Sequence, residues 1–192
     1  EVAGKEPIFR ILPYQKKKAG IVTTGSEVYY HRIEDKFTPV VIEKLKECGV
    51  TEVKQIQCND DHEMITEAIQ TLIEDGSDLI VCTGGMSVDP DDRTPFAIKN
   101  ACTEVVTYGT PVLPGAMFML AYCEKEGRQI PVMGLPGCVM YAKRTIFDLV
   151  LPRIMCDEKL HEKDFRLLGQ GGLCLSCPVC TFPNCGFGKG GY

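Results

Sequence analysis

An apolar run, a glycine pair and three carboxylates follow one another between residues 78 and 92. The run Asp-Leu-Ile-Val-Cys is typical of a buried strand, and Thr83, Gly84 and Gly85 come directly after it. Glycines let the backbone approach an anion closely, and the start of a following helix offers free N–H groups. The aspartates at positions 89, 91 and 92 repel phosphate but suit Mg²⁺, which bridges carboxylate to phosphate. The segment predicts a phosphate site beside a cation; an ordinary strand-to-helix turn with a solvated acidic loop is the alternative.

A second group of chemically active residues lies near the C-terminus. Its members are the four cysteines of the last 19 residues: Cys174, Cys177, Cys180 and Cys185. Short Cys-x2-Cys arms are typical of tetrahedral zinc sites, and Cys-x2-Cys-x2-Cys runs also bind [4Fe–4S] clusters. The spacing predicts a structural or regulatory metal centre, with zinc and iron–sulfur both open. The alternative is a tail without metal, which its many glycines would leave mobile.

The composition is that of an ordinary globular protein. Hydrophobic residues make up 44% of the chain and charged residues 24%, with a formal net charge of −5. The absence of a Lys/Arg stripe argues against a nucleic-acid partner. No apolar stretch reaches the roughly 18–20 residues that span a bilayer, so no membrane segment is expected. The seven other cysteines are scattered through the chain, which is typical of a reducing cytoplasm.

Strand and helix patterns alternate along the chain. Strands are expected at residues 18–24, 53–58, 78–82, 104–107 and 130–134. Helices are expected at residues 35–48, 60–75, 92–101, 116–126 and 137–155. The alternation predicts an α/β fold: a three-layer αβα arrangement around a mostly parallel sheet, with a small Cys-rich C-terminal tail. We expect a lead-in at residues 1–16, one domain at 17–156, and a charged helix with the tail at 157–192.

Ligands of parallel sheets collect where the strands end. Three turns at strand ends therefore point to one site. They are Thr23-Thr24-Gly25-Ser26-Glu27, Thr83-Gly84-Gly85 and Gly134-Leu135-Pro136-Gly137.

In this order and at these intervals, the motifs TTGSE, TGGMSVDPDDRTP and GLPG resemble the molybdopterin-binding domain family. That family includes the molybdopterin adenylyltransferases, the molybdenum insertases and two domains of gephyrin. The resemblance covers roughly residues 17–155 and includes the acidic segment CNDDHEMI, which begins at Cys58.

The resemblance implies a domain that binds molybdopterin or its adenylylated form. It implies that Asp60 and Asp92 act with Mg²⁺ on the pterin phosphate and ATP. The remaining cofactor-binding positions would be Thr24, Gly25, Glu27, Thr83, Gly84, Gly85, Ser87, Leu135, Pro136 and Gly137. The family also tends to form homo-oligomers.

The sequence departs from the family pattern at positions that bear on whether the chain catalyses adenylyl transfer or only binds its ligand. The adenylyltransferases usually carry TGGTG, whereas Met86 and Ser87 stand here, as in the insertase version. A polar residue usual after GLPG is replaced by Cys138, and Ala116 stands where the adenylyltransferases tend to have a carboxylate nearby. Binding of molybdopterin is therefore the primary hypothesis. The alternatives are an Mg-dependent adenylyl- or molybdotransferase and a nucleotide-processing enzyme of the same fold. In the binding hypothesis the tail would signal to a molybdoenzyme or a cofactor-synthesis protein.

Several of these residues also have plain structural interpretations. Asp92 could be an N-cap, and Asp60 and Asp61 would complement the dipole of a helix that begins there. Cys138 at a helix start could have a lowered pKa, or be a buried thiol. The run Met117-Phe118-Met119-Leu120 is expected to be helix core.

Overall fold

The structure, a computed structural model, describes residues 9–189. Six strands form one sheet in the order β2-β1-β3-β6-β5-β4. They are β1 (Lys18–Thr24), β2 (Glu52–Cys58), β3 (Leu79–Thr83), β4 (Glu104–Tyr108), β5 (Met119–Lys125) and β6 (Arg128–Leu135). β1, β2, β3 and β6 pair in parallel, and β5 is antiparallel to both of its neighbours. The predicted α/β class with a mostly parallel sheet is confirmed.

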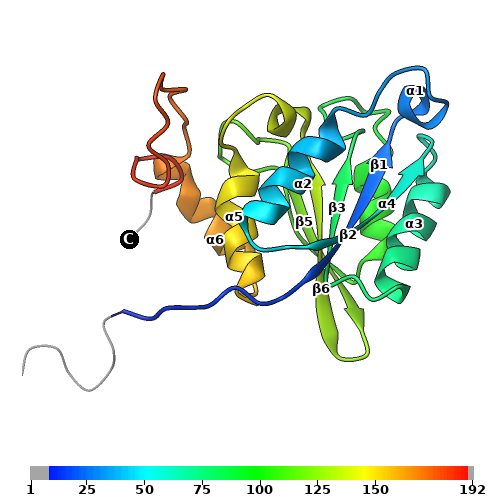
Figure 1. The fold of residues 1–192 in the computed structure, drawn as a ribbon, viewed down its shortest axis with the longest axis horizontal. Helices are drawn as coiled ribbons and strands as arrows, with labels where there is room; N and C mark the ends of the chain where they lie inside the picture. The colour runs from blue at the N-terminus through cyan, green and yellow to red at the C-terminus, as the bar shows by residue number, and fades with distance from the viewer. Residues whose placement is uncertain (1–8, 190–192) are drawn as a thin grey trace, which may run out of the picture.

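Helices cover both faces of this sheet (Figure 1). α2 (Phe37–Glu47) and α5 (Ile146–Met155) pack on one face, and α3 (His62–Glu74) and α4 (Thr94–Ala101) pack on the other. Successive side chains of a strand point to opposite faces. In β1, Ile21 accordingly joins the core under α2 and α5, whereas Val22 joins the core under α3 and α4. The three predicted layers are therefore present.

The helix predicted at residues 116–126 is wrong, because this segment contains strand β5. Its residues 119–123 are buried in succession, so the strand lacks the alternation that marks a half-exposed strand. Glu126 and Gly127 have φ angles of 52° and 75°, and they turn the chain directly into β6. Two positive φ angles at a two-residue loop are what a tight hairpin requires.

The single helix predicted at residues 137–155 is also wrong. A short 3₁₀ turn, η1 (Gly137–Met140), is followed by a loop, and α5 begins only at Ile146. Thr145 caps α5: its hydroxyl accepts from the N–H of Phe147, and its own N–H donates to Asp148 Oδ2 at 2.7 Å. This reciprocal cap fixes a new helix start inside an apolar stretch.

After α5 the chain forms α6 (Glu162–Leu167) and η2 (Leu168–Gly171), and the Cys-rich tail then lies beside α5 (Figure 1). The charged helix expected at the start of residues 157–192 is thus only six residues long. A further short helix, α1 (Ser26–Tyr29), follows β1 and was not predicted. In the described part of the chain, every helix lacks the length or the apolar character needed to cross a bilayer.

Arg153 at the end of α5 anchors the segment that leads to α6, and this contact should make stability depend on pH. Its guanidinium donates to Glu158 at 2.8 and 2.5 Å and to Asp164 at 3.1 Å. The contact with Arg153 holds the pKa of Glu158 below 4.5. Burial tends to raise the pKa of Asp164, but the His161 N–H and Arg153 outweigh it and keep that pKa below 3.8.

Carboxylates with lowered pKa values stabilise the fold above their unfolded pKa values, and this stabilisation is lost as the pH falls through the folded values. We expect Arg153→Met to lower the free energy of unfolding at pH 7 by about 1 kcal/mol, since the pair is partly screened. The variant should also lose less stability than the wild type between pH 7 and pH 3. Urea unfolding at both pH values measures this, and parallel losses in the two proteins would contradict it.

Candidate functional site

The predicted turns lie along one edge of the sheet because their strands are parallel neighbours. The carboxyl ends of β2, β1, β3 and β6 are aligned by the register pairs Thr24–Cys58, Thr23–Thr83 and Thr83–Leu135. From β1 the chain goes to β2 on one side, and from β2 it returns past β1 to β3. The strand order therefore reverses between β1 and β3, which is where open α/β sheets bind ligands.

Gly84 allows the turn after β3 to pack directly against the turn after β1. Its φ is 86°, and a Cβ atom there would lie 2.3 Å from the Thr24 carbonyl oxygen. At Gly85, with φ 53°, a Cβ atom would meet the Thr94 hydroxyl at 2.8 Å. The hydroxyls of Thr24 and Thr94 are themselves hydrogen-bonded at 3.2 Å. The two glycines thus allow the turn after β3 to pack closely against both the turn after β1 and the start of α4.

Two aspartates are each held by a serine in the same way. Ser26 donates to Asp60 Oδ2 through its N–H at 2.7 Å and its hydroxyl at 2.8 Å. Ser87 donates to Asp92 Oδ2 through its N–H at 2.5 Å and its hydroxyl at 2.8 Å. Among the residues that the structure describes, Oδ1 of Asp60 and of Asp92 accepts no hydrogen bond. Each clamp fixes one carboxylate oxygen and leaves the other available to a cation or its waters.

The observed helix starts show that the capping role considered for Asp92 is wrong and that Asp61, next to Asp60, is the cap of α3. Helix α4 begins at Thr94 with Arg93 at the N-cap position, so Asp92 is not its cap. In α3 the cap is Asp61, whose side chain accepts from the N–H groups of Glu63 and Met64. Asp60 is therefore free of a capping role.

The hydroxyl of Thr83 is buried at the end of β3. Within residues 9–189 it is the one buried side-chain nitrogen or oxygen that lacks a hydrogen-bond partner. Such a group costs about 1–3 kcal/mol when it is left unpaired. Thr83 is 0% exposed, so a partner from outside the chain would reach this hydroxyl only if the turn after β3 moved.

A cavity of about 550 Å³ lies between the turns after β3 and β6. Met86, Ser87 and Val88 line one side, and Pro136, Gly137 and Cys138 line the other. Residues 113–117 and two tail residues, Leu173 and Cys174, complete the wall. Ser87, Pro136 and Gly137 were predicted site residues, and the structure brings them to one cavity.

A second cavity of about 580 Å³ lies on the other side of the acidic loop. Ser87 and Asp92 line it together with Lys99 and Tyr108. The pKa of Tyr108 is raised, first by burial and then by the negative charge of Asp92. Lys99 supplies a positive charge in the same cavity, which the sequence analysis did not single out.

Other predicted residues lie elsewhere. The Leu135 side chain is fully buried in the core under α2 and α5, and Glu27 is exposed on α1. Burial raises the pKa of Cys138, so the activated thiol considered from sequence is wrong. Met117, predicted to be helix core, lies in the loop before β5 and lines both cavities.

No three Cys, His, Asp or Glu side chains within residues 9–189 are grouped closely enough to hold one metal ion. The four tail cysteines are thus not at the spacing of a single-ion site. Mg²⁺ binds through one or two carboxylates and keeps its waters. The free oxygens of Asp60 and Asp92 fit that requirement individually.

Comparison with known proteins decides the family. A model described as "Probable molybdopterin binding domain" matches residues 20–155. The chain belongs to this molybdopterin-binding domain family. The resemblance seen in the sequence motifs is therefore confirmed.

Solved structures share the fold of the family domain. The MoaB protein of Pyrococcus furiosus, titled a tungsten cofactor synthesizing protein, has a TM-score of 0.55 and 23% identity, over 65% of this chain and 84% of that one. A putative molybdenum cofactor biosynthesis protein of Corynebacterium diphtheriae has a TM-score of 0.59 and 14% identity, over 74% and 97%. A molybdopterin biosynthesis protein of Mycobacterium abscessus has a TM-score of 0.58 and 18% identity, over 73% and 92%.

Curated relatives match a shorter stretch. A CinA-like protein of Mycobacterium tuberculosis is 35% identical over 85 residues, which are 44% of this chain and 20% of that protein. The chain thus spans about a fifth of the length of the curated relatives it matches.

Proposed function

We propose that this chain binds molybdopterin or its adenylylated form at the carboxyl edge of the sheet. The observation that carries the proposal is the 550 Å³ cavity between the turns after β3 and β6, in a chain of this family. One wall carries Ser87 and the apolar Met86, and the other carries Pro136 and Gly137. An apolar cavity with a few polar groups suits a flat heterocycle with a polar edge.

Charge in the neighbouring cavity supports a phosphate-bearing ligand only when a cation is present. Asp92 and Asp89 repel phosphate, and Lys99 offsets part of that charge. When bound, Mg²⁺ would neutralise the phosphate beside these carboxylates. The Ser87 clamp would hold Asp92 for this role, whereas Asp60 is held by Ser26 and lines neither of the two cavities.

The alternative is catalysis. An adenylyltransferase would join the pterin phosphate to the α-phosphate of ATP and release pyrophosphate; a molybdotransferase would pass on the metal. A nucleotide-processing enzyme of the same fold would act on a flavin or pyridine nucleotide instead of molybdopterin. Incubation with molybdopterin, ATP and Mg²⁺ under anaerobic conditions separates binding from adenylyl transfer. We expect binding of molybdopterin without pyrophosphate release, whereas release that depends on molybdopterin would establish the transferase.

Asp92→Asn keeps the shape of the side chain but removes the charge that would hold Mg²⁺. We expect the variant to bind molybdopterin about tenfold more weakly in the presence of Mg²⁺. Without Mg²⁺ it should bind at least as tightly as the wild type, because the removed charge repels phosphate. Fluorescence titration with and without Mg²⁺ measures the difference. The matched control is Asp91→Asn. Asp91 is the neighbour of Asp92 in sequence and is exposed, so this variant removes the same charge from a side chain at the surface. An equal loss in both variants would show that only the overall charge of the loop matters.

A further inference from the structure

The Cys-rich tail is a closed loop held against the domain at both ends. At its start, the Leu113 N–H donates to Gly172 O at 2.9 Å, and the Cys174 N–H donates to Leu113 O at 2.8 Å. At its end, Phe187 is buried at 4% exposure in the core beside α5, and the Gly188 N–H donates to Gly171 O. The two ends of the loop therefore lie next to each other, joined by the hydrogen bond between Gly188 and Gly171.

Between these anchors the loop has no helix or strand, and all four of its thiols line one cavity. This cavity of about 400 Å³ is bounded by Cys174, Cys177, Cys180 and Cys185 on the tail and by residues 141–144 on the domain. The four sulfurs make no hydrogen bond to any described residue. Cysteines elsewhere differ: the Cys58 thiol donates to Met64 O, and the Cys156 thiol donates to Leu12 O.

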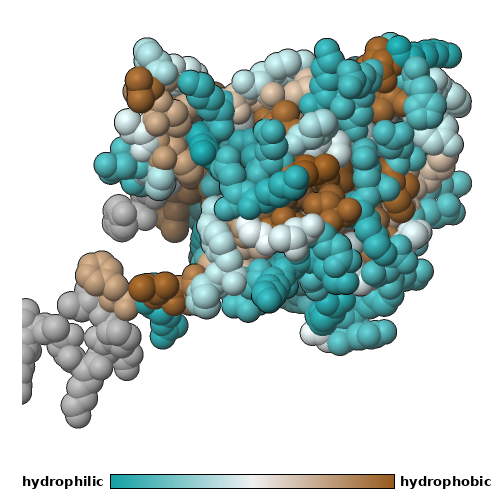
Figure 2. Space-filling view, viewed as in Figure 1, coloured by the Kyte–Doolittle hydropathy of each residue, from teal (hydrophilic) through white to brown (hydrophobic). Residues whose placement is uncertain are grey.

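Basic and aromatic groups face the thiols across this cavity. Lys143 and Arg144 line it, and the Arg144 guanidinium lies 5.1 Å from the centre of the Phe182 ring. Positive charge at this wall would offset the negative charge of a centre bound by four thiolates. Figure 2 shows hydrophobic colour on the tail, which accords with Leu175 and Val179 being 76% and 77% exposed.

The size of the cavity distinguishes between the two metal centres that fit the spacing. Zinc bound at about 2.3 Å from each sulfur would bring the sulfurs to about 3.8 Å of one another. The four thiols instead line a cavity of about 400 Å³, and within residues 9–189 no three Cys, His, Asp or Glu side chains are placed to hold one metal ion. A [4Fe–4S] cluster places an iron and sulfide core between its thiolates and so requires wider spacing, and it uses Cys-x2-Cys-x2-Cys runs.

We propose that the tail binds an iron–sulfur cluster through Cys174, Cys177, Cys180 and Cys185. The thiols lose their protons on binding iron, and the cluster fills the cavity between the loop and residues 141–144. Leu173 and Cys174 also line the cavity beside Gly137. The cluster therefore shares a wall with the candidate pterin site, while its presence can be tested without any pterin.

The test is iron and acid-labile sulfide analysis of the full chain, purified anaerobically and then treated with ferric iron, sulfide and a thiol reductant, which reduces part of the iron to the ferrous state. We expect about four irons and four sulfides per chain, with visible absorption that bleaches on reduction. Cys177→Ser combined with Cys180→Ser alters two exposed side chains and should remove most of the iron. Cys156→Ser, a half-buried thiol outside the tail, is the matched control and should retain it.

Circular dichroism of each variant verifies that the domain remains folded. Zinc without iron and sulfide would overturn the proposal. Absence of iron after the treatment would also overturn it, as would equal iron in the double variant and the Cys156→Ser control.

Discussion

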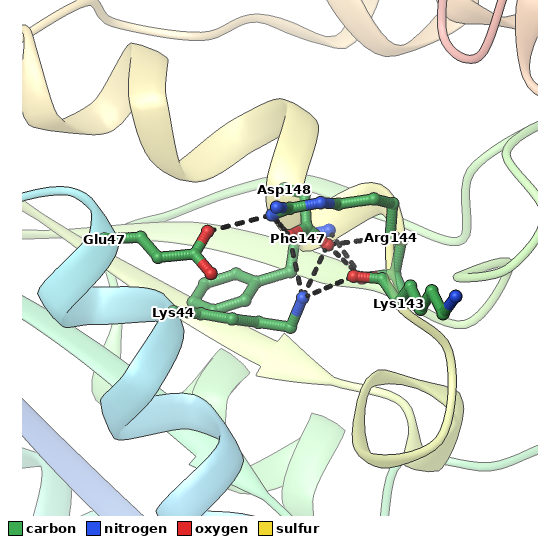
Figure 3. Close-up of polar contacts among 7 residues, drawn as sticks. Lys44, Glu47, Lys143, Arg144, Phe147 and Asp148 are labelled. Carbon is green, nitrogen blue, oxygen red and sulfur yellow. Dashed lines mark hydrogen bonds and ion pairs between the residues drawn. The ribbon is translucent and has the colours of Figure 1, made fainter. Parts of the chain in front are cut away.

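Asp148→Ala should lower the free energy of unfolding by about 3–5 kcal/mol, because it leaves a buried lysine without its partner. Lys44 of α2 donates to both oxygens of Asp148 in α5, at 2.7 and 3.0 Å, and also to Lys143 O at 3.1 Å (Figure 3). The side chains of Lys44 and Asp148 are 10% and 4% exposed. Asp148 also accepts from Arg144 and from the N–H of Thr145, so the variant loses the cap of α5 as well.

Urea unfolding at neutral pH measures the loss, and two further variants show its cause. Glu104→Ala breaks an exposed pair with Lys159 and should cost less than about 1 kcal/mol. Lys44→Met combined with Asp148→Leu removes both charges and should recover part of the stability lost in Asp148→Ala. If Asp148→Ala lowers the free energy of unfolding by no more than Glu104→Ala does, the Lys44–Asp148 pair does not hold α2 against α5.

Gly84→Ala should abolish the candidate site while leaving the rest of the fold in place. The added Cβ atom would lie 2.3 Å from the Thr24 carbonyl oxygen, and backbone atoms cannot rotate away as a flexible side chain can. The turns after β1 and β3 must then separate, at a cost of about 1–3 kcal/mol for overpacking and a similar amount for the φ of 86°. We expect molybdopterin binding to weaken at least about tenfold, as measured by fluorescence titration.

Gly127→Ala is the matched control. Gly127 also has a positive φ, 75°, but no atom lies within 4 Å of the added Cβ, and the residue turns the hairpin from β5 to β6. This variant carries only the backbone strain and should bind as the wild type does. Equal weakening in both variants would mean that stability rather than the contact with Thr24 controls binding.

Short β-rich runs and the turn residues that follow them were enough to predict the parallel strands of the sheet. The strands β1, β3 and β6 are short β-rich runs that end in glycine turns, and β2 ends at the acidic segment after Cys58. The motifs at these four strand ends lie along one edge of the sheet. β5 was missed because its apolar residues are buried on both faces, which removes the period that separates strand from helix. The Glu126-Gly127 pair was an available hairpin signal, because it stands between two β-rich segments and contains the glycine that such turns favour.

The sequence predicted the turns that form the candidate site, but it did not predict the side chains from other segments that line the two cavities. Glycines and aspartates at strand ends identify turns, so Gly84 and Asp92 could be found from their neighbours in sequence. Lys99 comes from α4, Tyr108 from the end of β4 and Leu173 from the tail, and only the folded chain brings them to the two cavities. The contact between Ser26 and Asp60 could not be predicted either, since it spans 34 residues, whereas Ser87 and Asp92 lie only five residues apart.

The most direct test of the central claim is an anaerobic titration of the wild-type chain with molybdopterin in the presence of Mg²⁺. The proposed site predicts saturable binding of one pterin per chain, weakened in Gly84→Ala and retained in Gly127→Ala. Absence of saturable binding to the folded wild-type chain, or equal binding by Gly84→Ala, would contradict a pterin site at this edge of the sheet.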